Sequence, residues 1–274
     1  MAKSSHPHPP KRDVPLTERL GSWAIAAFGE MWAVSLLLSE SLYQSTWGIR
    51  RTKTLTSGST VEQMVLLGTN ALPIVMLLSC LIGFTLALQS ALQLQKYGAM
   101  IFLADGIGVS MVTEIGPILT AIILAGRSGS AITAEIATMG VQEEVMALRS
   151  MAINPIHYLV LPRFWALSLT QPLLTVASCL AGIASGLLVG VLFFHLSASS
   201  FLTELREAIP LKYVWQALIK SLTFSWLIVF ISVTKGLNAR GGADAVGRAT
   251  TACVVNCIFA IICADAVFSF LFYW

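Results

Sequence analysis

Glu114-Ile115-Gly116-Pro117 opens the stretch that decides the fold of this chain, and Ala125-Gly126-Arg127-Ser128-Gly129-Ser130-Ala131 continues it. The stretch starts inside an apolar segment and leaves that segment through small residues. A charged turn between Met139 and Met151 follows, and the chain re-enters an apolar segment after Leu161-Pro162-Arg163. A glutamate followed by glycine and proline within an apolar helix has no use in a soluble protein. The pattern predicts a membrane transporter with a helix break at Gly116 and Pro117.

The composition is that of an integral membrane protein. Of the 274 residues, 56% are hydrophobic and 11% are charged, whereas an ordinary globular domain has about 25% charged residues. The strands of a membrane barrel would instead alternate over about 10 residues. We therefore predict an all-α integral membrane protein. Its expected parts are a disordered cytoplasmic tail at 1–15, an interfacial helix with a linker at 16–60, and one membrane domain at 61–274.

Five apolar segments are long enough to cross a hydrocarbon core of about 30 Å, which takes about 20 helical residues. The expected spans are Ala71–Leu92, Ile107–Gly126, Phe164–Phe194, Tyr213–Val233 and Ala249–Phe272. Residues 197–212 are expected to form a short helix outside the bilayer. Small residues spaced by four near Gly126 and Gly129 predict close helix packing, within the chain or between two copies.

The segment Leu16–Leu42 has apolar residues at helical spacing, but acidic and basic residues interrupt it. Its uninterrupted apolar part is too short to span a bilayer. The favoured interpretation is an amphipathic helix that lies in the membrane interface. The alternative is a poor spanning helix.

The Lys and Arg residues set the expected orientation. Most of the 17 fall in the N-terminal part, in the loop after the second span and in the loop after the fourth. The opposite side holds Lys96, Arg206 and Lys212. Because basic residues favour the cytoplasmic side, we expect a cytoplasmic N-terminus and a C-terminus on the other side.

Three ionisable residues fall within the expected spans: Glu114, Lys220 and Asp265. At a rise of 1.5 Å per residue they lie roughly 20, 22 and 25 Å from the basic residues at the cytoplasmic edge, and therefore in one layer. A charge at this depth needs a partner or a wet cavity. The sequence predicts an intramembrane polar cluster with Lys220 between two carboxylates. It leaves open whether the cluster works at a cavity floor or moving joint, or only fixes helix register.

Residues Val141–Met151 are expected to form a short amphipathic helix on the cytoplasmic side, stopped by Asn154-Pro155. The helix is placed to dock a partner. The alternative is a surface helix that only closes the loop.

The sequence shows no enzyme site. It has no G-x-x-x-x-G-K-[ST] phosphate loop, and Gly126-Arg127-Ser128-Gly129-Ser130 lacks both the spacing and the lysine. The four His and five Cys residues form no metal or catalytic pattern. We interpret the cysteines as small buried hydrophobic residues. No metal and no cofactor of the chain's own are expected.

The signature of the MlaE/YrbE family closely resembles one part of this chain: Glu114-Ile-Gly-Pro-Ile-Leu-Thr-Ala, with Ala125-Gly-Arg, Gly129-Ser-Ala, Ala134-Glu, Asn154-Pro and Pro162-Arg163 downstream. Ile219-Lys220-Ser221 and the run from Gly247 to Thr251 are further matches. The resemblance covers roughly Val61 to the C-terminus, which would make 61–274 an MlaE-type permease domain. Members of this family are permease subunits of ABC transporters that work with MCE proteins.

The resemblance implies a homodimer in the bacterial inner membrane, with a periplasmic C-terminus. It would move phospholipid between that membrane and a periplasmic MCE-domain protein, in support of outer-membrane lipid asymmetry, and would bind no nucleic acid. ATP and Mg²⁺ would be bound by a separate cytoplasmic ABC ATPase. This ATPase would dock on the loop helix, as a coupling helix, through Gln142, Glu143, Glu144, Val145, Ala147 and Leu148. A lipid pocket between the two copies would be lined by Leu86, Gln89, Gln93, Leu94, Tyr97, Glu114 and Ile115.

Two other functions stay open on the residues alone. One is a secondary transporter in which Glu114, Lys220 and Asp265 relay protons. The other is a non-transporting membrane scaffold of the same complex. Purification with or without an ATPase subunit separates the ABC permease from both.

Overall fold

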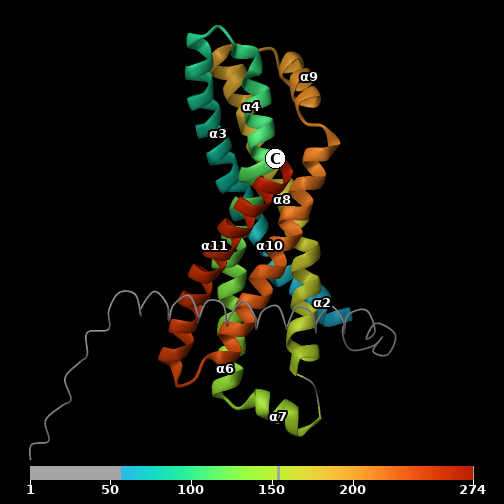
Figure 1. The fold of residues 1–274 in the computed structure, drawn as a ribbon, viewed down its shortest axis with the longest axis vertical. Coiled ribbons are helices and arrows are strands. Elements are labelled where there is room, and N and C mark those ends of the chain that lie inside the picture. Colours follow the sequence, from blue (N-terminus) through green and yellow to red (C-terminus); the bar gives the residue numbers. More distant parts are fainter. Residues whose placement is uncertain (1–56, 153–154, 274) are drawn as a thin grey trace, which may run out of the picture.

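The computed structural model of the chain describes residues 57–152 and 155–273, and every secondary-structure element within these ranges is helical. The helices form an elongated bundle (Figure 1). The all-α prediction is confirmed for this part of the chain. The expected tail at 1–15 and the expected interfacial helix Leu16–Leu42 lie outside the described residues.

Within the described residues, five helical segments are long and apolar enough to cross a membrane, and they match the five spans predicted for this part of the chain. They are Thr60–Lys96, Met100–Val141, Tyr158–Phe194, Leu211–Asn238 and Ala243–Phe272. All five extend beyond the predicted bounds at one end or at both, because the helical backbone continues past the roughly 20 residues that a hydrocarbon core requires. The largest difference is in the second span, which is predicted to end at Gly126 and runs to Val141.

Each span is built from one to six elements. The first contains α2 (Ser57–Leu67), η1 (Thr69–Ala71) and α3 (Leu72–Lys96); the second contains η2 (Met100–Phe102), α4 (Leu103–Ser110), η3 (Met111–Ile115), α5 (Gly116–Leu124), η4 (Ala125–Gly129) and α6 (Ser130–Val141). The third contains η5 (Ile156–Val160) and α8 (Leu161–Phe194), and the fourth and fifth are α10 (Leu211–Asn238) and α11 (Ala243–Tyr273). The short helices α7 (Glu144–Ser150) and α9 (Ala198–Ala208) connect spans.

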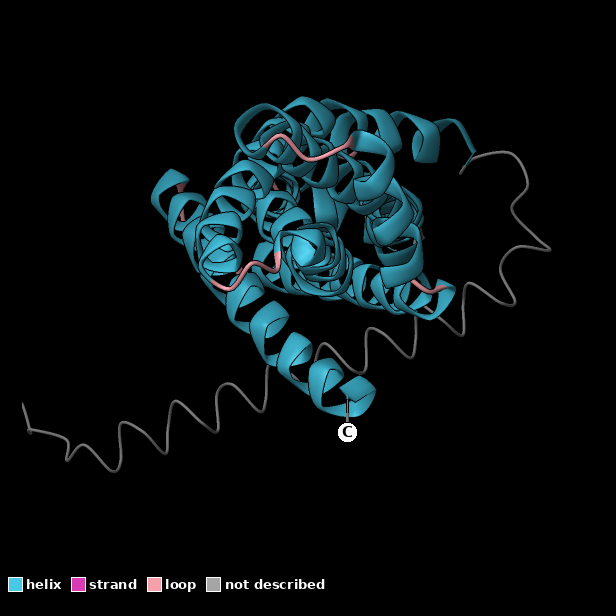
Figure 2. Ribbon diagram, turned by 90° about the horizontal axis from the view of Figure 1, so that it is seen from above, coloured by secondary structure: helices cyan, strands magenta, loops and turns pink. Residues whose placement is uncertain are grey.

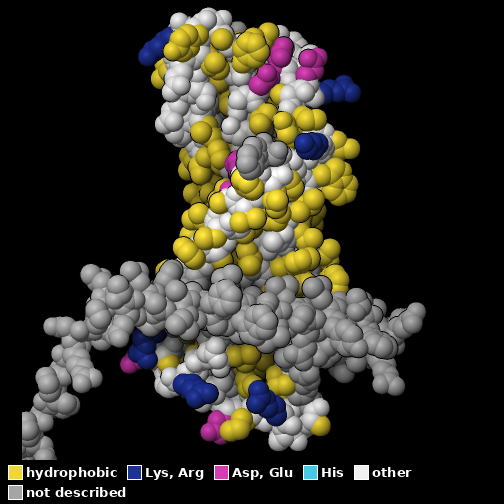
Figure 3. Space-filling model, in the orientation of Figure 1, with side chains coloured by type: hydrophobic (Ala, Val, Ile, Leu, Met, Phe, Trp, Pro, Cys, Tyr) yellow, Lys and Arg dark blue, Asp and Glu magenta, His cyan; other side chains and the backbone are white. Residues whose placement is uncertain are grey.

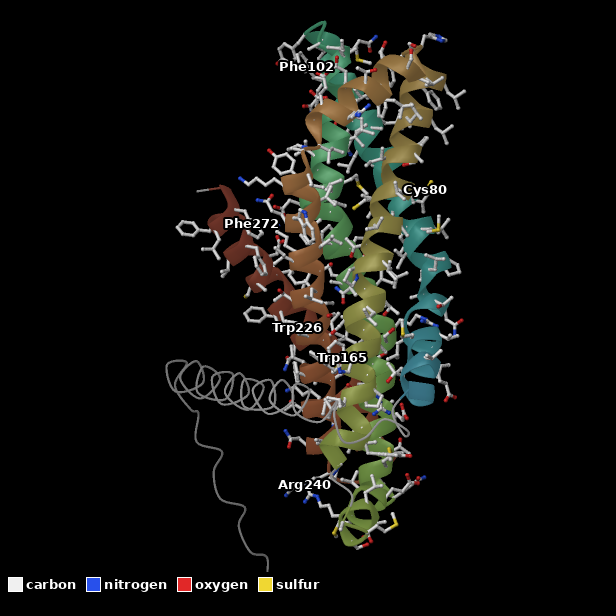
Figure 4. The ribbon with its side chains drawn as sticks, turned by 90° about the vertical axis from the view of Figure 1, so that its right-hand side faces the viewer. Cys80, Phe102, Trp165, Trp226, Arg240 and Phe272 are labelled. Atoms are coloured by element: carbon white, nitrogen blue, oxygen red, sulfur yellow. The ribbon has the colours of Figure 1, made fainter. Side chains whose placement is uncertain are left out.

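The two short helices mark opposite ends of the bundle, which we call the α7 end and the α9 end (Figure 1). Arg240 lies at the α7 end and Phe102 at the α9 end (Figure 4). Between the ends, hydrophobic side chains cover much of the visible face, and Lys and Arg side chains lie toward the two ends (Figure 3). This distribution suits a molecule that crosses a bilayer.

Helices α8 and α10 lie at the centre of the packing: α3 and α10 pack against α8, while α6 and α11 pack against α10. One hydrophobic core includes Leu124, Phe164 and Phe230, and a second core near the α9 end includes Leu103 and Met111. By contrast, α11 is largely exposed: only 11% of its most apolar 18-residue stretch is buried within the chain. The C-terminal end projects from the side of the bundle (Figure 2), and Phe272 points away from it (Figure 4).

Small residues let α3 and α8 approach closely. The hydroxyl oxygens of Ser79 and Ser178 are 2.7 Å apart and buried. A Cβ atom at Gly83 would collide with the backbone of Gly182. Small residues at such contacts are typical of helix pairs in membranes, where close backbone packing replaces the hydrophobic driving force.

Candidate functional site: a buried lysine between two carboxylates

The Glu-Ile-Gly-Pro sequence lies in a helix that does not break. Residues 111–115 form the π-helical turn η3, and the backbone N–H of Gly116 bonds to the carbonyl of Met111, five residues earlier. Pro117 then stands in the first turn of α5, where a missing N–H is tolerated. The predicted helix break at Gly116 and Pro117 is therefore wrong: the wide turn accommodates the proline ring and the span stays helical.

The proline has a local consequence for the carbonyl of Thr113. An α-helical residue 117 would donate its N–H to the carbonyl four residues earlier, but proline has no N–H to give. Instead, the Thr113 carbonyl accepts a hydrogen bond from the Nζ of Lys220 at 3.1 Å. The motif thus offers a backbone acceptor next to the side chain of Glu114.

The Lys220 side chain joins three spans. Its Nζ lies 2.8 Å from Oε2 of Glu114 on η3 and 2.9 Å from Oδ1 of Asp265 on α11. Its distance to the hydroxyl of Ser269 is 3.4 Å, and that hydroxyl donates to Oε1 of Glu114 at 3.0 Å. We call Glu114, Lys220, Asp265 and Ser269 the Lys220 cluster. The structure brings together the three charged residues that the sequence places at one depth.

Ser269 was not among the expected members, although the sequence contains a signal for it. It follows Asp265 by four residues, so both side chains lie on one face of α11. A hydroxyl at this spacing from a membrane carboxylate could have been included on that ground.

The cluster is enclosed on one side and open on the other. The side chain of Lys220 is 1% exposed, whereas that of Asp265 is 14% exposed and that of Glu114 is 32% exposed. The ammonium group is therefore shielded within the bundle, and the glutamate forms the accessible rim.

The residues expected to line a lipid pocket fall into two groups. Leu86, Leu94 and Ile115 are partly buried and pack against the core near the α9 end. Gln89, Gln93 and Tyr97 are exposed on the last turns of α3 and directly after it. A separate hollow of about 550 Å³ beside α9 is lined by other residues: Leu202, Thr203, Arg206 and Glu207.

The run of small residues in η4 holds the end of α2. Arg127 donates to the carbonyl of Leu66 at 3.3 Å, and Ser128 donates to that of Leu67 at 2.8 Å. These are the last residues of α2, whose carbonyls have no partner within the helix. Sequence reasoning did not assign this capping role.

The two glycines expected to allow close packing differ. A Cβ atom at Gly129 would lie 3.1 Å from Oγ of Ser232, so this glycine lets η4 approach α10. Within the described chain, a Cβ atom at Gly126 would meet no atom within 4 Å. The contacts at η4 also explain why the span continues past Gly126, since tertiary packing outweighs the low helix propensity of glycine and serine.

The loop helix is shorter than predicted, and the side chains that it exposes differ from those expected. Helix α7 begins at Glu144, because Glu143 adopts a left-handed conformation with φ 60°. Leu148 is 9% exposed, which removes it from the expected partner surface. Gln142, Glu143, Glu144 and Ala147 are exposed, Val145 is half-buried, and Met146, which was not expected at this surface, is 65% exposed.

An ion pair closes the base of this loop. The guanidinium of Arg163 on α8 is buried and lies 2.7 Å from a carboxylate oxygen of Glu135 on α6. The pair connects the last helix before the loop to the first long helix after it. Helix α7 therefore lies between two helices, α6 and α8, that this ion pair links.

The cysteines follow the expectation only in part. Cys179, Cys253 and Cys257 are buried, whereas Cys80 and Cys263 are exposed on α3 and α11. Across residues 57–152 and 155–273, no three His, Cys, Asp or Glu side chains gather as metal ligands would.

Comparison with known proteins gives one consistent result. The family described as Permease MlaE matches residues 60–271. A probable ABC transporter permease protein of Synechocystis is 35% identical over 215 residues, which are 78% of this chain and 82% of that protein. One from Rickettsia conorii is 32% identical over 96% of this chain and 95% of its own length. One from Porphyra purpurea is 36% identical over 82% of this chain and 86% of its own length.

Proposed function

The chain belongs to the MlaE family of permeases, and from this premise we propose that it is the membrane subunit of an ABC-type lipid transporter. It moves phospholipid between the inner membrane and a periplasmic MCE-domain partner. A separate cytoplasmic ATPase binds ATP and Mg²⁺ and drives the movement. The observation that carries this proposal is the match over residues 60–271, which includes all of the Lys220 cluster and the α7 loop.

The proposed lipid-binding pocket rests on α3. Leu86, Gln89, Gln93 and Tyr97 follow one another at helical spacing and share a face of this helix and its end. Amide side chains are costly among lipid tails unless they find polar partners. A pocket between two copies of the chain, which also receives lipid headgroups, would provide such partners. The exposed apolar faces of α3 and α11 are available for this homodimer.

The proposed contact with the ATPase rests on α7. Its exposed surface combines the carboxylates of Glu143 and Glu144 with the apolar side chain of Met146. An apolar anchor surrounded by charge is the usual composition of a protein interface. We assign this surface to the ATPase contact.

The proposed orientation places the α7 end in the cytoplasm, the C-terminus in the periplasm and the chain in the bacterial inner membrane. Support comes from the described basic residues, because Arg127, Arg149, Arg163, Lys235, Arg240 and Arg248 belong to the α7 side.

Labelling of single introduced cysteines tests this orientation. Ser199 and Asp244 are both exposed, and they lie on opposite sides in the proposed topology. In intact cells, an impermeant thiol reagent is expected to modify S199C and not D244C, with the unsubstituted chain as the background. The reverse pattern would overturn the orientation, and equal labelling of both would overturn the crossing between them.

Purification of the full chain from its native membrane tests the functional class. An ABC permease is expected to bring an ATPase subunit with it at fixed stoichiometry. A chain that purifies alone and moves lipid in response to a proton gradient would be a secondary transporter. A chain that binds the partner complex but is dispensable for lipid movement would be a scaffold.

A further inference from the structure

The Lys220 cluster contains two carboxyl groups and a single ammonium group. If Glu114 and Asp265 were both ionised, the cluster would carry one uncompensated negative charge. Lys220 is 1% exposed and Asp265 is 14% exposed, so little water is present to stabilise that charge. Isolated buried charges are strongly disfavoured, and such sites usually become neutral by binding a proton.

The hydrogen bonds indicate which carboxyl group is the neutral one. Glu114 uses both oxygens as acceptors, Oε2 from Lys220 at 2.8 Å and Oε1 from Ser269 at 3.0 Å. This pattern fits a carboxylate, which only accepts. Asp265 accepts from Lys220 through Oδ1 at 2.9 Å, and its carboxyl group also lies within hydrogen-bonding range of the carboxyl group of Glu114. A proton on Oδ2 leaves the hydrogen bond from Lys220 to Oδ1 in place, and Oδ2 can then donate this proton.

Other charged groups on the neighbouring helices are too distant to replace this proton. Helix α11 packs against α5, α6, η4 and α10. Arg127 and Glu135 follow Glu114 by 13 and 21 residues, and Lys235 follows Lys220 by 15, which places them roughly 20 Å or more toward the α7 end. Asp244 and Arg248 of α11 itself are about 25 Å or more from Asp265 by the same rise. Lys212 precedes Lys220 by eight residues and is exposed.

From these observations we propose that the Lys220 cluster is a proton-binding site, in which Oδ2 of Asp265 carries one exchangeable proton. The carboxylate of Asp265 takes this proton from water that reaches the cluster past the 32% exposed side chain of Glu114. Binding converts the cluster from a net charge of −1 to neutrality, and release restores the carboxylate. This inference goes beyond the proposed function, since the proton is held whether or not the cluster takes part in lipid movement.

Infrared spectroscopy of the purified full chain tests the site without any transport assay. The chain at neutral pH is expected to show the C=O stretching band of a protonated carboxyl group, shifted in D₂O and lost on strong alkalinisation. Both D265N and E114Q should abolish this band, because each leaves one carboxylate paired with Lys220. In contrast, K220M removes the only cation of the cluster, so its band should be at least as strong as that of the unsubstituted chain.

A control variant is needed because Oδ1 of Asp105 is buried and has no hydrogen-bond partner in the described part of the chain. D105N should leave the cluster's band in place. The proposal is overturned if the unsubstituted chain has no such band, if the band survives in D265N and E114Q, or if only D105N removes it. Both amide variants are nearly isosteric with the native side chains, and a single symmetric gel-filtration peak shows that each is folded before its spectrum is compared.

Discussion

Replacement of Lys220 by alanine is expected to destabilise the chain more than any other single change in a span. The substitution leaves Glu114 and Asp265 facing each other without a cation in a poorly hydrated layer. Removing one partner of a buried ion pair typically costs about 3–5 kcal/mol. The lower part of this range is expected here, because Glu114 is partly exposed. Thermal unfolding of the purified chain measures the loss.

The combined variant E114L/K220M/D265L separates structure from function. Replacing a whole buried ionic set by apolar residues can be nearly neutral for stability, so we expect this variant to unfold at a temperature close to that of the native chain. We also expect it to assemble normally and to move no lipid, since the polar rim has gone. Full lipid-transfer activity of the combined variant would show that the Lys220 cluster has only a structural role. A stable and active K220A would contradict the buried ion pairs themselves, because Lys220 would then have to reach water.

The second large effect is expected at α7. E143R reverses a charge at the start of the helix, and M146D places a carboxylate on its exposed apolar residue. A charge mismatch or a lost apolar anchor at an interface costs about 2 kcal/mol or more, which corresponds to a drop in affinity of more than tenfold. We expect both variants to insert normally and to lose ATPase association and lipid-stimulated hydrolysis by this factor.

The control for E143R is E207R, the same charge reversal at an exposed glutamate of α9. It lies at the other end of the bundle and should leave ATPase association unchanged. Equal losses in E143R and E207R would indicate a general effect of charge. Unchanged association and hydrolysis in both α7 variants would leave α7 as a helix that only closes the loop.

The sequence predicts the five spans of the described part of the chain because each needs a long apolar run, and all five runs are helical in the structure. It also predicts the meeting of Glu114, Lys220 and Asp265, since helical rise converts residue number into depth and a buried charge requires a partner. Both predictions depend only on the order of residues along the chain, because run length and depth follow from residue number. For the same reason, the sequence gives the layer of the cluster and not its exact hydrogen bonds.

The features that the sequence does not predict depend on contacts between distant segments. Gly116-Pro117 indicates a break, yet the π-turn η3 keeps the span helical. Gly126 indicates an end, yet contacts of Gly129 and Thr133 with α10 carry the helix to Val141. Leu148 has the spacing of a partner-facing residue, and the structure buries it. In each case the local pattern is ambiguous and tertiary packing decides between its interpretations.

The most direct test of the proposed function is lipid transfer in a reconstituted system. The full chain would be placed in vesicles with its ATPase and its MCE-domain partner, and transfer of labelled phospholipid would be followed with and without ATP. We expect transfer that requires ATP and this chain, and that E114L/K220M/D265L abolishes while assembly is retained. ATP-independent transfer driven by a proton gradient, or transfer that persists without the chain, would contradict the account.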